Sequence, residues 1–152
     1  MITRRNLLIA AAAAPLAAAI AAPAHAAAPP VFSEGGAAIR GADAVAYFTE
    51  GRAVDGSPDF TAEHMGTTWR FVSAENRDLF MADPDAYAPQ YGGYCAFAVS
   101  RGYTASIDPE AWTVHDGKLY LNFSKSVRRR WSRDIPGNIA AGDANWPAVL
   151  EA

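Results

Sequence analysis

The chain has 152 residues, of which 51% are hydrophobic and 19% are charged, and its formal net charge is −3. This is the length of one domain, and the high apolar fraction excludes wholesale disorder. The mildly acidic balance excludes a general nucleic-acid-binding surface, and the single cysteine excludes an intramolecular disulfide or a zinc cage of several thiolates.

The N-terminal segment has the pattern of an export signal. Two adjacent arginines precede residues 7–22, an alanine-rich apolar stretch, and the small-x-small sequence of residues 24–26 suits a signal peptidase. Paired arginines in this place resemble a twin-arginine signal, and an ordinary secretory signal is the alternative. The apolar stretch is shorter than the roughly 20 residues that span a bilayer. We predict a signal peptide over residues 1–26, cleaved after Ala26, and a periplasmic mature protein without a membrane span.

The remaining chain is expected to hold a linker over residues 27–38 and one domain over residues 39–150. Turn residues, helix caps and apolar periodicity predict its elements. The first half is predicted to hold a partly helical segment over 37–51 capped by Asp43, a hairpin over 61–73 turning near His64, a helix capped by Ser73 and a short helix ending near Tyr87. A tight loop over 91–94 and an apolar run over 94–100 follow. The second half then holds a hairpin over 112–123 turning at Asp116-Gly117, a basic helix capped by Ser124 and a helical tail.

Residues of the first half recur 51 positions later. The identities are Gly41 with Gly92, Gly51 with Gly102, Pro58 with Pro109, His64 with His115, Gly66 with Gly117, Ser73 with Ser124, Arg77 with Arg128 and Asp83 with Asp134. The order of predicted elements repeats as well, which indicates an internal duplication. Turn and cap residues shared by any two such units are the alternative. We predict an α+β fold of two β-hairpin-plus-helix units, whose strand pairs form one small antiparallel sheet with helices on one face.

Strand alternation and helical spacing assign most of the aromatic side chains to the core. This predicted aromatic core comprises Trp69, Phe71, Phe80, Tyr87, Trp112, Tyr120, Phe123 and Trp131, with Leu79 beside it. Tyr91 and Tyr94 flank two glycines and are expected to line a cleft instead.

Two stretches of the sequence resemble the YHS domain. Residues 64–73 follow the pattern His-x-Gly-x-x-Tyr-x-Phe-Cys-Ser, with Trp69 at the tyrosine position, and residues 80–87 follow Phe-x-x-Asp-Pro-x-x-Tyr. Further stretches typical of exported YHS-domain proteins are residues 39–48, 89–96 and 117–122. Related domains bind metal through cysteines and occur beside copper transporters. The resemblance therefore implies a small copper carrier, sensor or accessory factor. This chain has Val72 and Asn76 where two of those cysteines are expected, so the thiolate cage of the family is not carried over.

The residues that remain for a metal are Cys95, His64 and His115. Thiolate, thioether and imidazole ligands suit copper(I). We predict Cys95 as the central ligand, assisted by His64 or His115, with the thioether of Met65 as a further candidate. If residues 94–100 are helical, the helix N-terminus lowers the pKa of the Cys95 thiol. The alternatives are a buried, inert cysteine and solvent-exposed turn histidines.

Other functions fit the same residues. No nucleophile-elbow motif or carboxylate pair indicates catalysis, so we expect a protein that is not an enzyme. A metal-free interaction module is the first alternative, with the cleft at Tyr91 and Tyr94 and the face of Arg128, Arg129 and Arg130 contacting a partner protein. That basic cluster, with Lys125 and Arg133, is otherwise a solvated helix face or a docking surface for an acidic partner or anionic lipid. A thiol redox protein is the second alternative.

Overall fold

The computed structural model describes residues 12–15, 17 and 26–152. The predicted signal peptide over residues 1–26 therefore falls mostly outside the described residues. Within the described part of the chain, no helix combines the length and the apolar character needed to cross a membrane.

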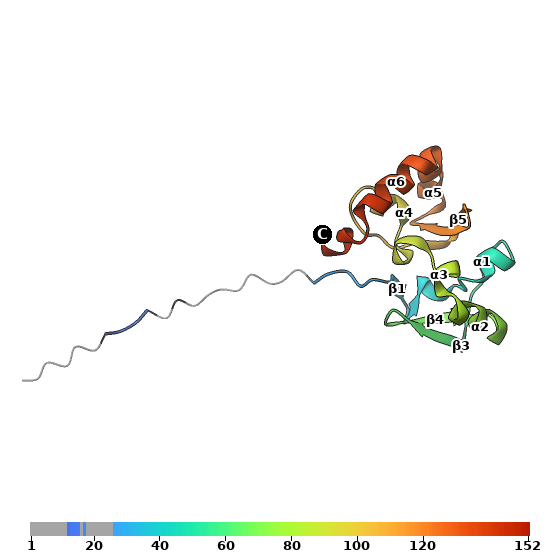
Figure 1. The fold of residues 1–152 in the computed structure, drawn as a ribbon, viewed down its shortest axis with the longest axis horizontal. Helices are drawn as coiled ribbons and strands as arrows, with labels where there is room; N and C mark the ends of the chain where they lie inside the picture. Colours follow the sequence, from blue (N-terminus) through green and yellow to red (C-terminus); the bar gives the residue numbers. More distant parts are fainter. Residues whose placement is uncertain (1–11, 16, 18–25) are drawn as a thin grey trace, which may run out of the picture.

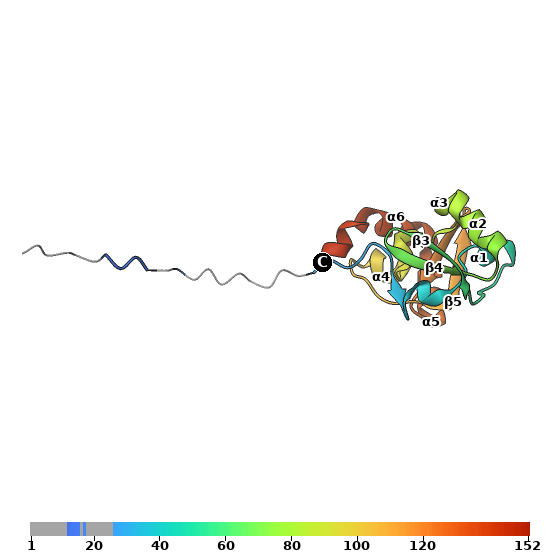
Figure 2. The ribbon, with the colours of Figure 1, turned by 90° about the horizontal axis from the view of Figure 1, so that it is seen from below.

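Two successive units make up the domain (Figure 1). The first unit consists of β1 (Ser33–Glu34), β2 (Ala37–Ala38), the 3-10 turn η1 (Ile39–Gly41), α1 (Ala46–Thr49), β3 (Ser57–His64), β4 (Thr67–Phe71), α2 (Ala74–Ala82) and α3 (Pro84–Tyr87). The second unit consists of η2 (Gln90–Gly93), α4 (Ala96–Ser100), β5 (Asp108–His115), β6 (Lys118–Asn122), α5 (Lys125–Trp131), η3 (Ser132–Asp134), α6 (Ile135–Asn145) and η4 (Ala148–Glu151). Figures 1 and 2 show α4 and α6 next to each other, away from α2 and α3.

The two hairpins have the same register at an offset of 51 residues. Trp69 lies opposite Ala62 in β3–β4, and Tyr120 lies opposite Thr113 in β5–β6. Both hairpins turn through two residues with positive φ, at positions 65–66 and 116–117, as a primed turn requires. Both units then begin a helix at a serine, because Ser73 Oγ and Ser124 Oγ each accept a backbone N–H three residues later at 3.1 Å. The predicted repeat of hairpin and capped helix is confirmed.

The predicted α+β class is confirmed, but the two strand pairs do not form one sheet. Each hairpin is a separate two-stranded antiparallel sheet, and β1–β2 is a third. Within each unit the hairpin packs instead against its own preceding segment, since β2 and η1 lie beside β4, and η2 lies beside β6. The helices still cover the hairpins as predicted, with α2 against β3 and β4 and α5 against β5 and β6.

The β6 strand joins the two units by being buried on both faces. Leu119 and Leu121 belong to a core cluster that also contains Trp69, Phe71 and Phe80 of the first unit. Tyr120, which faces the other way, packs in a second cluster with Trp131. The first cluster is therefore shared by both units, and the second is covered by α4, α6 and the C-terminal turn.

Three expectations about burial are wrong. Leu79 and Phe123 are exposed rather than in the core. The expected linker over residues 27–38 packs on the body of the domain, since the backbone N–H of Phe32 donates to Gly92 O at 2.9 Å and that of Ala28 donates to Leu150 O at 2.7 Å. Backbone hydrogen bonds of this kind leave no signal in the composition of the segment.

A buried carboxylate organises the first unit. Asp43 is fully buried, and its Oδ1 accepts the backbone N–H groups of Val45 and Ala46 at 2.9 and 3.2 Å, at the start of α1. Its Oδ2 accepts the backbone N–H of Val72 at 2.9 Å and the side-chain amide of Asn76 at 2.8 Å. One side chain thus caps α1, as predicted, and also ties it to the end of β4 and to α2.

We expect Asp43→Ala to lower the free energy of unfolding by roughly 3 kcal/mol, because it leaves four donors without their acceptor. Urea unfolding followed by tryptophan fluorescence measures the loss. Asp59→Ala, which removes an exposed carboxylate of the same unit, should change stability by less than about 0.5 kcal/mol. Equal midpoints for the two variants would contradict the role of Asp43.

Candidate functional site

Cys95 is buried and belongs to the framework of the second unit. Its side chain accepts the backbone N–H of Phe123 at 3.2 Å, and its Sγ donates to Asn122 Oδ1 at 3.6 Å. The same Asn122 oxygen accepts the backbone N–H of Phe97 at 3.0 Å, in the first turn of α4. In these contacts Cys95 is a neutral thiol that donates one hydrogen bond and accepts another.

The environment of the Cys95 thiol opposes thiolate formation. Burial raises the pKa of Cys95, and this effect outweighs the backbone N–H groups near the start of α4 that lower it. The expected contribution of the helix N-terminus is therefore present, but desolvation reverses the net direction of the pKa shift. The surroundings of Cys95 fit the alternative of a structural, buried cysteine.

The two histidines occupy matched hairpin tips but different surroundings. The His64 ring packs edge-on against Phe80, with centroids 5.5 Å apart, and lies 6.2 Å from the Trp69 ring. His115 instead has its Nε2 3.4 Å from Asp116 Oδ2 at the second tip. Within the described residues, no group of three or more His, Cys, Asp or Glu side chains is placed to hold a metal. This search covers groups of three or more, so ligation by Cys95 with His64 or His115 alone stays a prediction.

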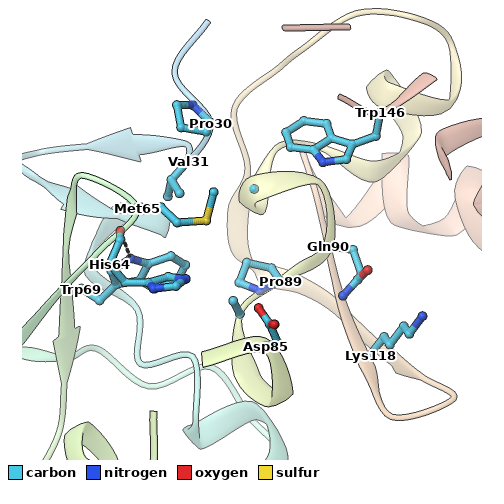
Figure 3. A pocket seen from close by; sticks show the side chains of 12 residues that line it. Pro30, Val31, His64, Met65, Trp69, Asp85, Pro89, Gln90, Lys118 and Trp146 are labelled. Atoms are coloured by element: carbon cyan, nitrogen blue, oxygen red, sulfur yellow. Dashed lines mark hydrogen bonds between the residues drawn. The ribbon is translucent and has the colours of Figure 1, made fainter. Parts of the chain in front are cut away.

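A cleft of about 380 Å³ lies between the two units, and His64 forms part of its wall (Figure 3). The side chains of His64, Met65 and Trp69 stand on one side, and those of Gln90, Lys118 and Trp146 face them across the opening. The full lining comprises Pro30, Val31, His64, Met65, Trp69, Asp85, Ala88, Pro89, Gln90, Gly92, Lys118 and Trp146.

The walls of the cleft are mainly apolar, and its polar groups carry both signs of charge. Its apolar members are Pro30, Val31, Met65, Trp69, Ala88, Pro89 and Trp146, of which Val31 and Trp69 are each only 2% exposed. His64, Asp85, Gln90 and Lys118 supply the polar groups. Met65 is exposed over 57% of its surface, and its thioether points into the opening. Such a cavity can hold an apolar group and orient it by a few polar contacts.

The backbone at Gly92 shapes the floor of the cleft. Gly92 has φ +62°, and a Cβ there would lie 2.0 Å from the carbonyl oxygen of Pro30. Glycine is therefore required for the close approach of the N-terminal segment at residues 30–32. This close approach places Pro30 and Val31 on the wall of the cleft.

Tyr91 and Tyr94 lie behind the cleft wall rather than along it. Both are buried, with exposed fractions of 5% and 6%, and neither is among the residues that line the cleft, so the expectation that they line it is wrong. The Tyr91 hydroxyl donates to Asp143 Oδ1 at 3.0 Å on α6, and the Tyr94 hydroxyl donates to Pro29 O at 2.7 Å. Both rings also pack against Trp146. The tyrosines therefore hold the two segments that form the walls.

Sequence reasoning found His64 and Met65 but missed most of the cleft. Pro30, Asp85, Lys118 and Trp146 come from segments far apart in the chain, and none belongs to a motif with them. The glycine pair at positions 92–93 was the available signal, because it marked a close backbone approach beside the cleft.

Comparisons of the chain with models of protein families, with curated proteins and with solved structures found no match. The resemblance to the YHS domain therefore stays a prediction from the sequence motifs.

We expect Cys95 to react with an aromatic disulfide reagent at least roughly 100-fold more slowly in the native protein than in urea. Because burial raises its pKa, the native rate should stay low as the pH passes about 8.5, the ordinary value for a thiol, whereas the rate in urea should rise. The chain has one cysteine, so the absorbance change reports this thiol alone. Fast native modification at neutral pH would contradict a structural role.

Proposed function

We propose that this protein is a non-enzymatic binding module whose cleft accepts an apolar side chain of a partner polypeptide. The observation that supports this proposal is the composition of the cleft, with two tryptophans and two prolines around an opening that carries His64, Asp85 and Lys118. Aromatic residues and methionine are enriched where proteins bind one another, and buried aromatic pockets hold the anchors of such interfaces.

The anchoring of the cleft walls favours binding by a preformed site. Trp146 is held between Tyr91 and Tyr94, and Trp69 packs on Phe80 with centroids 4.9 Å apart. Little conformational entropy is lost when such walls close on a ligand. Met65 is the flexible member, since an unbranched thioether adapts its shape to different apolar partners.

We also propose that the module acts in the periplasm after export through a twin-arginine signal. The sequence pattern of residues 1–26 supports this, together with the contacts of the following segment. Cleavage after Ala26 leaves Ala28 bonded to Leu150 and leaves Pro30 and Val31 on the cleft wall. The proposed mature protein thus retains its whole binding site.

We expect a displayed library of random linear peptides to yield binders whose affinity depends on the cleft. Met65→Ala should weaken them roughly fivefold or more, and Lys118→Glu should weaken those that carry acidic residues beside the apolar anchor. Met81→Ala is the matched control, because Met81 is exposed to a similar extent, 61% against 57% for Met65, but lies on α2 outside the cleft. Fluorescence anisotropy of labelled peptides measures the affinities.

This function would be overturned if the selection enriched no peptide over a blank support. It would also be overturned if the enriched peptides bound the Met65→Ala and Met81→Ala variants equally, since their contacts would then lie elsewhere.

A second candidate function is binding of copper(I), in line with the predicted role as a copper carrier or accessory factor. One observation favours it, because the His64 imidazole and the Met65 thioether line the same cleft. Imidazole and thioether are ligands that suit copper(I). In this proposal Cys95 and His115 take no part, since Cys95 is buried in the framework and His115 does not line the cleft.

If copper(I) binds in the cleft, His64→Ala and Met65→Ala should each lower the affinity roughly tenfold or more. Competition with a colorimetric copper(I) chelator measures it. His115→Ala and Met81→Ala are matched controls and should leave the copper(I) affinity unchanged. The Cys95→Ala variant, provided that it folds, should also leave this affinity unchanged. Loss of copper only in the Cys95 variant would instead restore the thiolate ligand predicted from the sequence.

A further inference from the structure

A continuous basic face surrounds α5 on the second unit. It is formed by Arg101, Lys125, Arg128, Arg129, Arg130 and Arg133. Within the described residues, none of these side chains forms an ion pair. Six cations therefore lie together without an ion pair on a protein whose net charge is −3, and Asp134 is the one carboxylate among the described residues that lines the same surface.

Three adjacent hollows connect the basic face. The first, of about 490 Å³, is lined by Lys125, Arg128, Arg129, Ser132 and Arg133. Arg133 also lines the second, which contains Arg101, Arg130 and the carboxylate of Asp134. Arg130 in turn lines the third, beside Tyr103 and Phe123. Because neighbouring hollows share an arginine, the surface is continuous from Lys125 to the two aromatic rings.

The aromatic end of the basic face is unusually exposed. Tyr103 and Phe123 expose 53% and 51% of their surface, although they come from different loops. Rings of this size are normally buried in a domain core, and their exposure beside cations marks an interaction surface.

The first unit shows that the fold does not require five of these six cations, whereas the sixth, Arg128, has Arg77 at the matched position. At the positions 51 residues earlier, Lys125, Arg129, Arg130 and Arg133 correspond to Ala74, Asp78, Leu79 and Ala82, and Arg101 corresponds to Glu50. The hairpin and its capped helix form there without them. Moreover, Lys125 and Arg129 stand four residues apart on α5, and like charges at this spacing destabilise a helix. Attraction of the last-turn arginines to the helix C-terminus does not account for Lys125 or Arg101.

We propose that this basic face binds the surface of a bilayer rich in anionic phospholipid. The arginine guanidinium groups contact lipid phosphates, which they fit through paired hydrogen bonds, and Lys125 adds a positive charge. Tyr103 and Phe123 enter the interfacial region, where aromatic rings are favoured. The two exposed rings beside the cations match the pairing of aromatic and basic side chains that is favoured at a membrane interface.

The proposed membrane contact leaves the cleft between the units available. No residue lines both the cleft and any of the three basic hollows. A membrane-bound protein can therefore still present the cleft to a partner, and the two proposals can be tested separately.

The test is flotation of the full chain with vesicles of phosphatidylglycerol and phosphatidylcholine in equal parts, and with vesicles of phosphatidylcholine alone. Each cation near an anionic surface strengthens binding by roughly fivefold. The variant with Arg129→Glu, Arg130→Glu and Arg133→Glu should therefore bind anionic vesicles roughly 100-fold more weakly. The variant with Arg40→Glu, Arg52→Glu and Arg77→Glu has the same change in net charge and should bind like the parent.

Vesicle affinity and its salt dependence, both measured on a double variant, test whether the two aromatic rings touch the membrane. The double variant Phe123→Ser with Tyr103→Ser, once shown to be folded, should bind anionic vesicles more weakly than the parent. The salt dependence of this binding should be unchanged, because the cations remain. Residues 1–26 are common to all variants, so differences between variants measure the basic face.

Equal binding of the two triple variants would overturn the proposal, as would equal binding of the parent to both vesicle types. Binding to polyglutamate that is lost in the first triple variant, without flotation on anionic vesicles, would also overturn it and assign the face to an acidic polypeptide.

Discussion

In each unit, one buried polar link ties the start of a short helix to the end of a hairpin. The first unit uses Asp43, which accepts the N–H groups of Ala46 and Val72. The matched N–H groups of the second unit belong to Phe97 and Phe123, and they are accepted by Asn122 and Cys95. Buried N–H groups must find acceptors, so each helix is fixed relative to its hairpin.

The two links differ in chemistry although the side chains that form them are equally buried. The β4 strand buries one face, with Thr68 and Arg70 partly exposed, whereas β6 carries Leu119 and Leu121 at the matched positions and is buried on both faces. The carboxylate of Asp43 satisfies four donors by itself. In the second unit an amide and a thiol share the task without a charge. A buried charge is costly unless it is well paired, and the four donors around Asp43 meet that requirement.

The repeat also explains how two matched positions acquire different roles. His64 and His115 lie at equivalent hairpin tips, but only His64 faces the N-terminal segment and Trp146 across a cleft. The helices α2 and α5 begin with the same serine cap, yet only α5 is surrounded by unpaired cations. A repeated scaffold thus presents a mixed-charge apolar cleft between its units and a basic surface on one of them. The first suits a partner side chain, and the second suits an anionic surface.

The sequence by itself determined the local structure of this protein. The turns at 65–66 and 116–117, the serine caps and the offset of 51 residues depend on neighbouring residues, and they were predicted correctly. Only the tertiary structure decided the separation of the hairpins into different sheets, the packing of residues 27–38 and the burial of Cys95. Each of these depends on contacts between segments far apart in the chain. The cleft is the clearest case, because Pro30, Met65 and Trp146 meet only after both units have packed together.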